Sequence, residues 1–272
     1  MDIQKIIDSK DILLCNKCNI GIPKEENGLL ICEECHYKFK ISNSKLIFDD
    51  NYFDKKNWVN VSKNFKTPKT TKIAFNRING PKISELIHKL KINGHSINLG
   101  SGNDNYEGYI NVDLGNYRSV DIVTDITNLP IQNETISFIA SNSVLEHIYD
   151  YEAVINEIYR VLKKNSYLYI CVPAMSPRHH EIDYHRWTSK GLSKLLSGRF
   201  EILESGSCRG IAFSLVTYVN SIIDYKINNM FINIIIKNLW KFISLPLFLI
   251  KDDNSEEAQA LSNTIYIIAK KN

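Results

Sequence analysis

The stretch from Ile97 to Leu114, INLGSGNDNYEGYINVDL, places a glycine-rich turn between two apolar runs, and the second run stops at an aspartate. A glycine turn at the carboxyl end of one strand, followed by an acid at the end of the next, is typical of a nucleotide site in an open α/β sheet. Three cofactor classes compete for such a turn: a nucleoside triphosphate, a nicotinamide dinucleotide and S-adenosylmethionine.

The residues around the turn narrow this choice. The phosphate-binding pattern G-x-x-x-x-G-K-[ST] is absent from the sequence, and the third glycine of the dinucleotide pattern is missing. An S-adenosylmethionine site needs only a close backbone approach to the methionine and ribose, with an acid that accepts both ribose hydroxyls. Asp113 fits because a carboxylate can accept from two hydroxyl donors, although NAD sites use an acid in the same way.

Helix-like and strand-like patterns alternate from Pro81 onward. Apolar spacing predicts helices within residues 81–93, 150–164 and 188–198, with Asp150 and Thr188 as the N-caps of the last two. Short apolar runs between them read as strands. This alternation predicts an α/β fold with a parallel sheet that helices cover on both faces.

Three spaced segments resemble the class I S-adenosylmethionine-dependent methyltransferases: INLGSGN with GYINVDL, DITNLPIQNETISFIASNSVLEHI, and EIYRVLKKNSYLYICVP. The resemblance covers about residues 81–206 and a last strand at 264–270. It implies a Rossmann-like, mostly parallel seven-stranded sheet and S-adenosylmethionine as the cofactor. The implied cofactor residues are Asn98, Gly100, Ser101 and Gly102 at the methionine part, Asp113 and Leu114 at the ribose and adenine, Asp125 and Ile126 at the adenine, and Ser141 and Asn142 beside the sulfonium.

The chain departs from this family at two places. Asn98 stands where many members have an acid, which leaves the methionine ammonium with one partner fewer, and backbone carbonyls would serve in its place. Asn165 and Ser166 replace the glycines that often follow the long helix.

The segment after the fifth predicted strand, VPAMSPRHHEIDYHRWTSKGL, would carry the acceptor site, because loops at the carboxyl ends of the strands face the cofactor. We expect His180 to act as a general base, with His147 as the second candidate. Asp183, His185 and Arg186 are candidate substrate-binding residues, for which packing and capping remain open alternatives.

Two C-x-x-C pairs, Cys15 with Cys18 and Cys32 with Cys35, are separated by a segment with turn residues in its middle. This spacing predicts a zinc ribbon, in which a hairpin brings four thiolates around one tetrahedral Zn²⁺. Four thiolates close the coordination sphere, so we expect a structural rather than a catalytic ion.

The whole chain has 272 residues and a formal net charge of +3, too small to indicate a nucleic-acid binder by itself. We expect a zinc ribbon at residues 1–50, a basic and aromatic linker or cap at 51–80, and a methyltransferase domain at 81–272. The N-terminus lacks the layout of a signal peptide, which predicts a cytoplasmic protein.

An apolar insertion is expected at about 211–260. Its polar residues Lys226, Asn229, Asn233, Lys237, Lys241 and Ser244 recur every three or four positions. Such a stripe predicts either an interfacial helix at residues 226–250, with the lysines at the headgroups of a membrane surface, or a helix pair that packs on the domain or in a dimer. The oligomeric state stays open.

Similar methyltransferases act in surface-polysaccharide and lipid-linked glycan pathways. The sequence therefore favours a methyltransferase that methylates a hydroxyl of a sugar or related group and works as a peripheral protein at the inner face of the membrane. Two alternatives remain: an RNA base methyltransferase that uses the zinc module and residues 51–80 to hold RNA, and a non-catalytic zinc-ribbon binding or activator protein.

Overall fold

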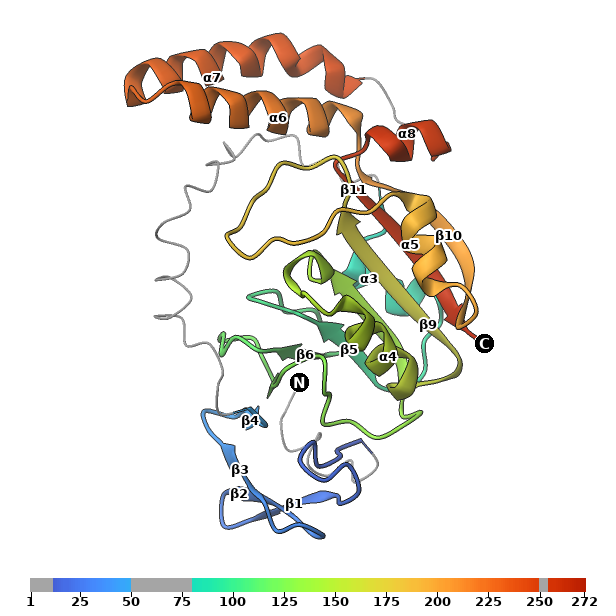
Figure 1. Ribbon diagram of the computed structural model, residues 1–272. Helices are drawn as coiled ribbons and strands as arrows, with labels where there is room; N and C mark the ends of the chain where they lie inside the picture. Colours follow the sequence, from blue (N-terminus) through green and yellow to red (C-terminus); the bar gives the residue numbers. More distant parts are fainter. Residues whose placement is uncertain (1–11, 50–79, 250–253) are drawn as a thin grey trace.

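The computed structural model describes residues 12–49, 80–249 and 254–272. Within these ranges, eleven strands form one sheet in the order β1-β2-β3-β4-β7-β6-β5-β8-β9-β11-β10 (Figure 1). The strands are β1 Pro23–Glu26, β2 Leu29–Cys32, β3 Lys38–Ile41, β4 Leu46–Ile47, β5 Ser96–Leu99, β6 Tyr109–Asp113, β7 Ile122–Val123, β8 Ile136–Asn142, β9 Leu162–Pro173, β10 Phe200–Arg209 and β11 Thr264–Lys271. The helices are α3 Ile83–Lys89, α4 Tyr151–Val161, α5 Ser189–Leu196, α6 Ile211–Lys226, α7 Met230–Ser244 and α8 Glu256–Leu261, with 3₁₀ turns η1 Leu145–His147 and η2 Leu245–Leu249.

The part of the sheet from β7 to β10 has the seven strands that the sequence predicts. All neighbouring pairs in it are parallel except the two that β11 makes, since β11 runs antiparallel between β9 and β10. The strand order reverses at β5, which lies between β6 and β8. This reversal opens a crevice at the carboxyl ends of the strands, where open α/β sheets bind ligands.

The expectation of a seven-stranded sheet with a separate zinc ribbon needs correction, because strands β1–β4 continue the same sheet. Strand β4 pairs with β7 in parallel, and the backbone N–H groups of Leu46 and Phe48 donate to Asp121 and Val123 at 2.9 Å each. An uncovered β7 would expose a row of unpaired backbone groups. The N-terminal module supplies their partners.

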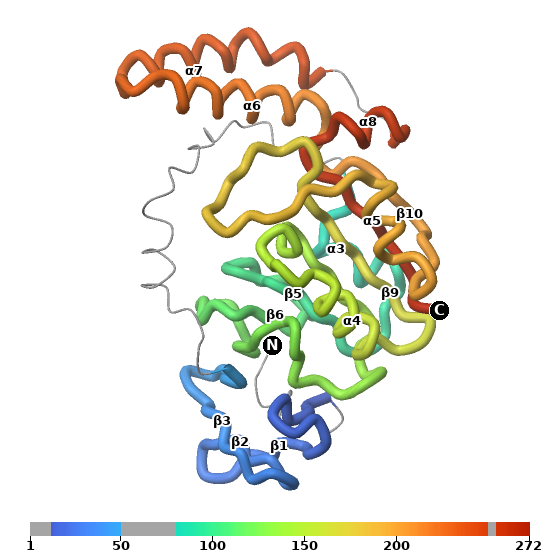
Figure 2. The backbone as a smooth tube through the Cα atoms, in the orientation of Figure 1, coloured from blue at the N-terminus to red at the C-terminus, as the bar shows by residue number. Residues whose placement is uncertain are grey.

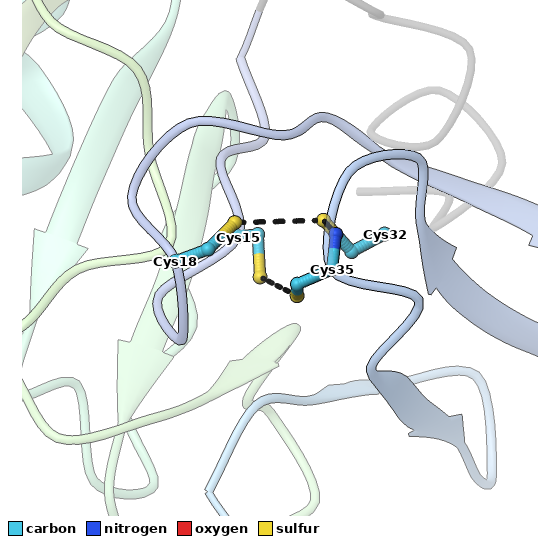
Figure 3. Close-up of side chains that lie close together, drawn as sticks. All are labelled: Cys15, Cys18, Cys32 and Cys35. Carbon is cyan, nitrogen blue, oxygen red and sulfur yellow. Dashed lines mark hydrogen bonds between the residues drawn. The ribbon is translucent and has the colours of Figure 1, made fainter.

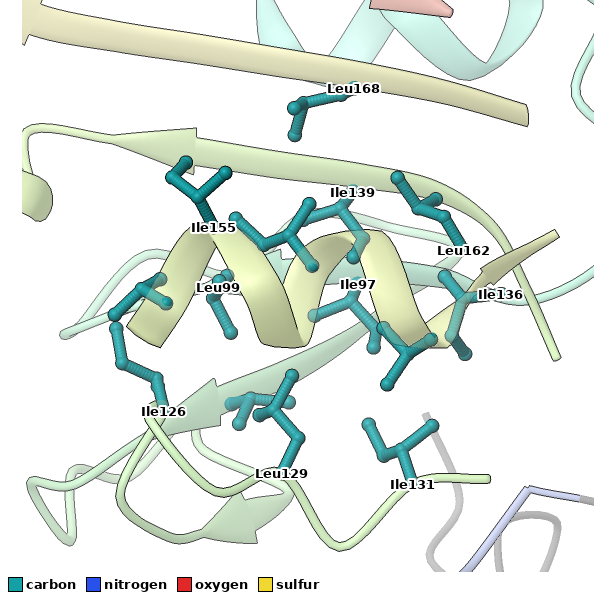
Figure 4. Packing of buried hydrophobic residues seen from close by; sticks show 14 of the residues in the cluster. Ile97, Leu99, Ile126, Leu129, Ile131, Ile136, Ile139, Ile155, Leu162 and Leu168 are labelled. Carbon is teal, nitrogen blue, oxygen red and sulfur yellow. The ribbon is translucent and has the colours of Figure 1, made fainter. Parts of the chain in front are cut away.

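Both parts of this sheet share one apolar core. Ile12, Leu30 and Phe39 of the N-terminal module belong to the same buried cluster as Ile97 and Leu168 of the central strands. Figure 4 shows part of this cluster, with Ile97 and Leu168 labelled. We therefore describe residues 12–49 as a module docked on the sheet rather than as an independent unit. The expected linker or cap at 51–80 lies almost entirely outside the described residues.

Helix α4 covers the sheet with Val154, Ile155, Ile158 and Val161, all fully buried. The predicted N-cap is confirmed, since the Asp150 carboxylate accepts the backbone N–H of Ala153 at 3.1 Å.

The helix ends three residues earlier than its pattern suggests. Leu162 is already extended and pairs with Ile136 as the start of β9. Asn165 adopts a φ of 64°, a left-handed conformation that asparagine tolerates, which explains how it replaces a family glycine.

The insertion forms a helical hairpin, α6 and α7, that extends away from the sheet (Figures 1 and 2). Part of its polar stripe faces inward, so Lys237 does not reach lipid headgroups as expected, whereas Lys226 is exposed. Lys237 is only 6% exposed and donates to the Asp224 carboxylate of α6 at 2.5 Å, and the Asn233 amide donates to the same oxygen at 3.0 Å. The hairpin turns its apolar side chains outward. Large exposed ones are Ile222, Tyr225, Met230, Phe231, Ile232, Ile235, Leu239, Phe242 and Ile243.

Candidate functional site

The glycine turn after β5 lies in the crevice of the sheet. Gly100 and Gly102 have φ values of 68° and 54°, which glycine adopts without strain. A Cβ at Gly100 would overlap the side chain of Val144, which follows β8. The turn therefore passes directly against the segment that leads into η1, and only glycine fits there.

Asp113 at the end of β6 holds this turn in place. One carboxylate oxygen accepts the N–H of Gly102 at 2.8 Å and the other accepts the N–H of Gly115 at 2.6 Å. Burial raises the pKa of Asp113 above its ordinary value, although both hydrogen bonds oppose this. Each oxygen retains a lone pair, so the carboxylate has the capacity to accept two hydroxyls of a ribose.

Two serine hydroxyls lie buried at the strand ends beside the turn. Ser101 is 5% exposed and Ser141 is 1% exposed, and neither hydroxyl has a hydrogen-bond partner among the described residues. Buried hydroxyls are normally satisfied, so a ligand in the crevice is a natural partner for them. Asn142, directly after Ser141, is exposed.

Other residues predicted for the cofactor have partners within the protein. The Asn98 amide donates to the Asn111 side chain on β6 at 3.1 Å. The Asp125 carboxylate accepts the backbone N–H and the hydroxyl of Thr127 at 2.9 and 2.8 Å. Ile126 is 4% exposed within the core, and Leu114 is partly buried. Their roles toward the adenine and methionine parts stay predictions.

Arg186 organises the acceptor loop through its hydrogen bonds. It donates from Nε to Ser176, from its two terminal nitrogens to the carbonyls of His185 and Pro177, and to both oxygens of Asp183. A guanidinium has five N–H donors, and these five bonds occupy all of them. These bonds give Arg186 and Asp183 a loop-shaping role, and their expected role in substrate binding stays a prediction.

His185 is also held by packing. Its Nε2 lies 3.3 Å from the Tyr149 carbonyl oxygen, and its ring packs against Tyr151 and Trp187. These aromatic side chains, with Thr188, Gly191 and Leu195, line a hollow of about 340 Å³ beside α5. Thr188 is the N-cap of α5 as predicted, accepting the Gly191 N–H at 3.0 Å.

A cluster of Glu146, His147 and His179 lies between η1 and the acceptor loop. Glu146 Oε1 is 3.8 Å from the Nε2 atoms of both histidines. The Nδ1 of His147 bonds the Ile182 carbonyl at 2.5 Å, and the Nδ1 of His179 lies 3.2 Å from the Asp183 carboxylate. Both Nδ1 atoms therefore carry the proton, and both Nε2 lone pairs point into the cluster.

His180 has the opposite tautomer. Its Nδ1 accepts the backbone N–H of Ile182 at 3.2 Å, which places the ring proton on Nε2. In this arrangement His147 or His179 is better suited than His180 to accept a proton or a cation. The sequence singled out His147 but missed Glu146, whose signal is a charged residue inside the apolar run SVLEHI.

Burial controls the charges of this cluster. It raises the pKa of Glu146 to about 7, an effect to which nearby Asp183 adds, and it lowers the pKa of His179 to about 4 and that of His147 below its ordinary value. The two imidazoles are therefore neutral near pH 7.

The four predicted cysteine ligands come together at the docked module (Figure 3). Their sulfur atoms lie within 4.8 Å of one another, with Cys15 and Cys35 at 3.7 Å and Cys18 and Cys32 also at 3.7 Å. A tetrahedral ion with metal–sulfur bonds of about 2.3 Å separates its ligands by about 3.8 Å. A Cβ at Gly21 would overlap the Cys32 sulfur, so the backbone leaves room for this sulfur, and the four residues fit one metal ion.

Comparison with known proteins agrees with this fold and site. Residues 100–170, from the glycine turn into β9, match a family described as a methyltransferase domain. Over these residues the chain is similar to methyltransferase domains, the class of enzyme that the sequence predicts. No curated protein matches the chain.

Solved structures with a similar fold include three methyltransferase structures. The chain aligns with 1,6-didemethyltoxoflavin-N1-methyltransferase of Burkholderia thailandensis at 12% identity and a TM-score of 0.46, over 79% of this chain and 86% of that one. It aligns with a possible histamine N-methyltransferase of Thermotoga maritima at 16% identity and a TM-score of 0.44, over 80% and 94%. The third is a complex of the Trm112 methyltransferase activator with a putative methyltransferase from Haloferax volcanii, at 15% identity and a TM-score of 0.41, over 69% and 89%.

Proposed function

We propose that this protein transfers a methyl group from S-adenosylmethionine to a hydroxyl of a sugar or related group, in a surface polysaccharide or lipid-linked glycan at the cytoplasmic face of a membrane. The observation that carries the proposal is the attachment of the apolar hairpin to the acceptor loop. The Asn263 amide lies 3.3 Å from the Met175 carbonyl oxygen in that loop and 3.2 Å from the Thr217 hydroxyl in α6. A membrane that holds the hairpin would thus hold the acceptor loop near its surface.

The hairpin has the polarity of a segment built for lipid. Met230–Leu249 is long and apolar enough to cross a membrane by length and composition, and 11% of it is buried. Of its two lysines, Lys237 and Lys241, the first pairs with Asp224 within the hairpin. Ion pairing of this kind is how charged groups are tolerated near hydrocarbon, and the outward apolar side chains supply the contact area.

Two exposed aromatic rings support a sugar acceptor. Tyr149 is 79% exposed and Tyr184 is 54% exposed, and their rings meet edge to face with centroids 5.7 Å apart. Tyr149 lies two positions after His147, and Tyr184 directly precedes His185. Exposed aromatic rings beside a reactive cluster offer an apolar face on which a ring-shaped acceptor can rest.

The cysteine site would hold one structural Zn²⁺, since four thiolates match its preferred ligands. Zinc would fix the two turns of the docked module. The chemistry of methyl transfer does not involve it, because a closed set of four ligands has no position for a substrate.

The acceptor class can be tested by offering total RNA and a membrane glycan extract in parallel, with labelled methyl donor. We expect label in the glycan fraction. The Asp113→Ala variant is the control, and its affinity for S-adenosylmethionine should fall by about 1.5–3 kcal/mol in calorimetry, because a charge-assisted acceptor is lost. Label in RNA alone would replace the proposal by an RNA methyltransferase, and absence of cofactor binding by the unchanged protein would favour a binding or activator protein.

Membrane association can be tested by flotation with vesicles. Serine at Phe231, Ile235 and Phe242 should abolish co-flotation, because each substitution removes an apolar side chain worth about 1.5–3 kcal/mol when buried. Ile20→Ser is the matched control, since Ile20 is an isoleucine of the docked module that is 74% exposed. Failure of the unchanged protein to float, with a dimer in sedimentation that the triple variant dissociates, would assign the apolar face to a second copy.

A further inference from the structure

Glu146 is a buried carboxylate without a hydrogen-bond partner in the part of the chain that the structure describes. Its side chain has 0% exposure, and neither of its oxygens has a hydrogen-bond partner among the described residues. A buried charged group normally requires a partner, because an unpaired one costs several kcal/mol. The two nearest candidates are the Nε2 atoms of His147 and His179, which are also acceptors when the rings are neutral.

When Glu146 is ionised, three acceptor atoms face one another, and a positive partner between them would satisfy all three. Glu146 Oε1 lies 3.8 Å from each Nε2. One possible ligand atom from each of the three residues lies within 4.8 Å of the other two. A divalent cation with bonds of about 2.1 Å separates its neighbouring ligands by about 3.0–3.4 Å. A contraction of less than 1 Å in the two distances from Glu146 Oε1, within side-chain rotations, would bring the carboxylate to this spacing from both histidines.

The surroundings of both histidines match those of metal ligands. In metal sites, the second ring nitrogen of a ligating histidine usually donates to a carbonyl or a carboxylate, which fixes the tautomer. His147 donates to the Ile182 carbonyl, and His179 to Asp183. The carboxylate of Asp183 in turn accepts hydrogen bonds from both terminal nitrogens of Arg186. The loop that Arg186 shapes thus orients His179 toward Glu146.

We propose that Glu146, His147 and His179 bind one divalent first-row transition-metal ion, whose open positions bind the acceptor hydroxyl. Two imidazoles and one carboxylate are the ligand set of open sites for such ions, with positions left for a substrate. The site is accessible on one side, since the His179 side chain is 42% exposed and that of His147 is 23% exposed. Val144, which contacts the glycine turn, immediately precedes η1 and therefore keeps the ion beside the cofactor crevice.

The ion would act as a Lewis acid in the transfer. It lowers the pKa of the bound hydroxyl, whose proton leaves to water on the open side. The oxygen then forms a bond to the methyl carbon as the carbon–sulfur bond breaks. The sulfur keeps that electron pair, and the products are the methyl ether and S-adenosylhomocysteine. This catalytic role rests on the proposed function, whereas binding of the ion does not.

Mn²⁺ is the probe of choice, since it prefers nitrogen and oxygen over thiolate ligands and is visible by electron paramagnetic resonance. Titration of the full chain, with zinc left at the cysteine site, should show one Mn²⁺ bound per chain. Glu146→Gln should weaken this binding about 100-fold and His179→Ala about 30-fold, whereas His185→Ala, outside the cluster, should stay within about twofold.

Two results would overturn the site: no Mn²⁺ binding at millimolar concentration, or equal affinity in the unchanged protein and Glu146→Gln. Mn²⁺ binding without any effect on methyl transfer to a glycan would overturn the catalytic role alone. Mn²⁺ binding together with label found only in RNA would leave the site standing and remove the glycan as its acceptor.

Discussion

The cysteine module and the helical hairpin are both additions to the same methyltransferase sheet, and they behave in opposite ways. The module, at one edge of the sheet, buries its apolar side chains in the common core and extends the sheet through β4. The hairpin follows β10 at the other edge, buries its polar side chains and exposes its apolar ones. The difference leads us to propose that the module stabilises the fold, whereas the exposed apolar face of the hairpin contacts a membrane or another molecule.

The largest expected effect tests whether the module belongs to the common core. Cys32→Ser should remove the metal and lower the stability of the whole chain by at least about 4 kcal/mol, since structural zinc contributes its binding energy to folding. For a chain of this size we expect a loss of about 10 °C or more in Tm, measured by calorimetry alongside metal analysis.

Cys171→Ser is the control for this substitution, because Cys171 is buried but lies outside the metal cluster. It should keep the metal. A Cys32→Ser protein in which the rest of the chain melts at the unchanged temperature would show that the module folds independently. The module would then not be part of the common core.

The sequence predicts best those features that depend on residues close together in the chain or on fixed geometry. Caps such as Asp150 and Thr188 depend on residues three positions away, so their patterns were sufficient. Asp113 could be found because strand ends meet at one edge of a parallel sheet. Four cysteines could be paired because metal geometry restricts their spacing.

Contacts between segments far apart in the chain could not be predicted from the sequence. The stripe containing Lys237 was recognised, but amphipathic spacing does not say which face meets protein, and only the pairing with Asp224 shows it. Glu146 could not be recognised as part of a site because its neighbour His179 lies 33 positions later in the chain, and only the folded loop brings the two together. The same holds for Arg186, whose five hydrogen bonds could not be read from a pattern that suggested substrate binding.

An intermediate effect tests the hairpin as a separate structural unit. Asp224→Ala leaves Lys237 buried without its partner, which should weaken the packing of α6 on α7 by about 2–3 kcal/mol. This figure lies below that of a fully buried pair because Asp224 is 30% exposed. Hydrogen exchange should accelerate in residues 211–244 and stay unchanged in the central strands.

Lys226→Ala provides the comparison for Asp224→Ala, since Lys226 is an exposed charge at the end of α6. It should leave exchange unaltered. Faster exchange throughout the sheet in Asp224→Ala would mean that the hairpin is part of the core, as the module is.

The smallest expected effect concerns a contact between the module and the cofactor site. Lys45, next to β4, is 8% exposed and donates to the Asn116 side chain at 2.7 Å and to the Tyr117 carbonyl. These two residues follow Gly115, whose N–H is held by Asp113. The module therefore braces the loop that adjoins the proposed ribose acceptor.

Lys45→Met keeps most of the apolar stem but removes both hydrogen bonds. The loop should then order less well in the free protein, and cofactor binding would have to supply that ordering. We expect the affinity for S-adenosylmethionine to fall by about 0.5–1 kcal/mol, or about two- to fivefold, in calorimetry. Lys38→Met, at an exposed position of β3, should leave it unchanged. Equal affinities in both variants would confine the module to a stabilising role, whereas the expected loss would give it a second role at the site.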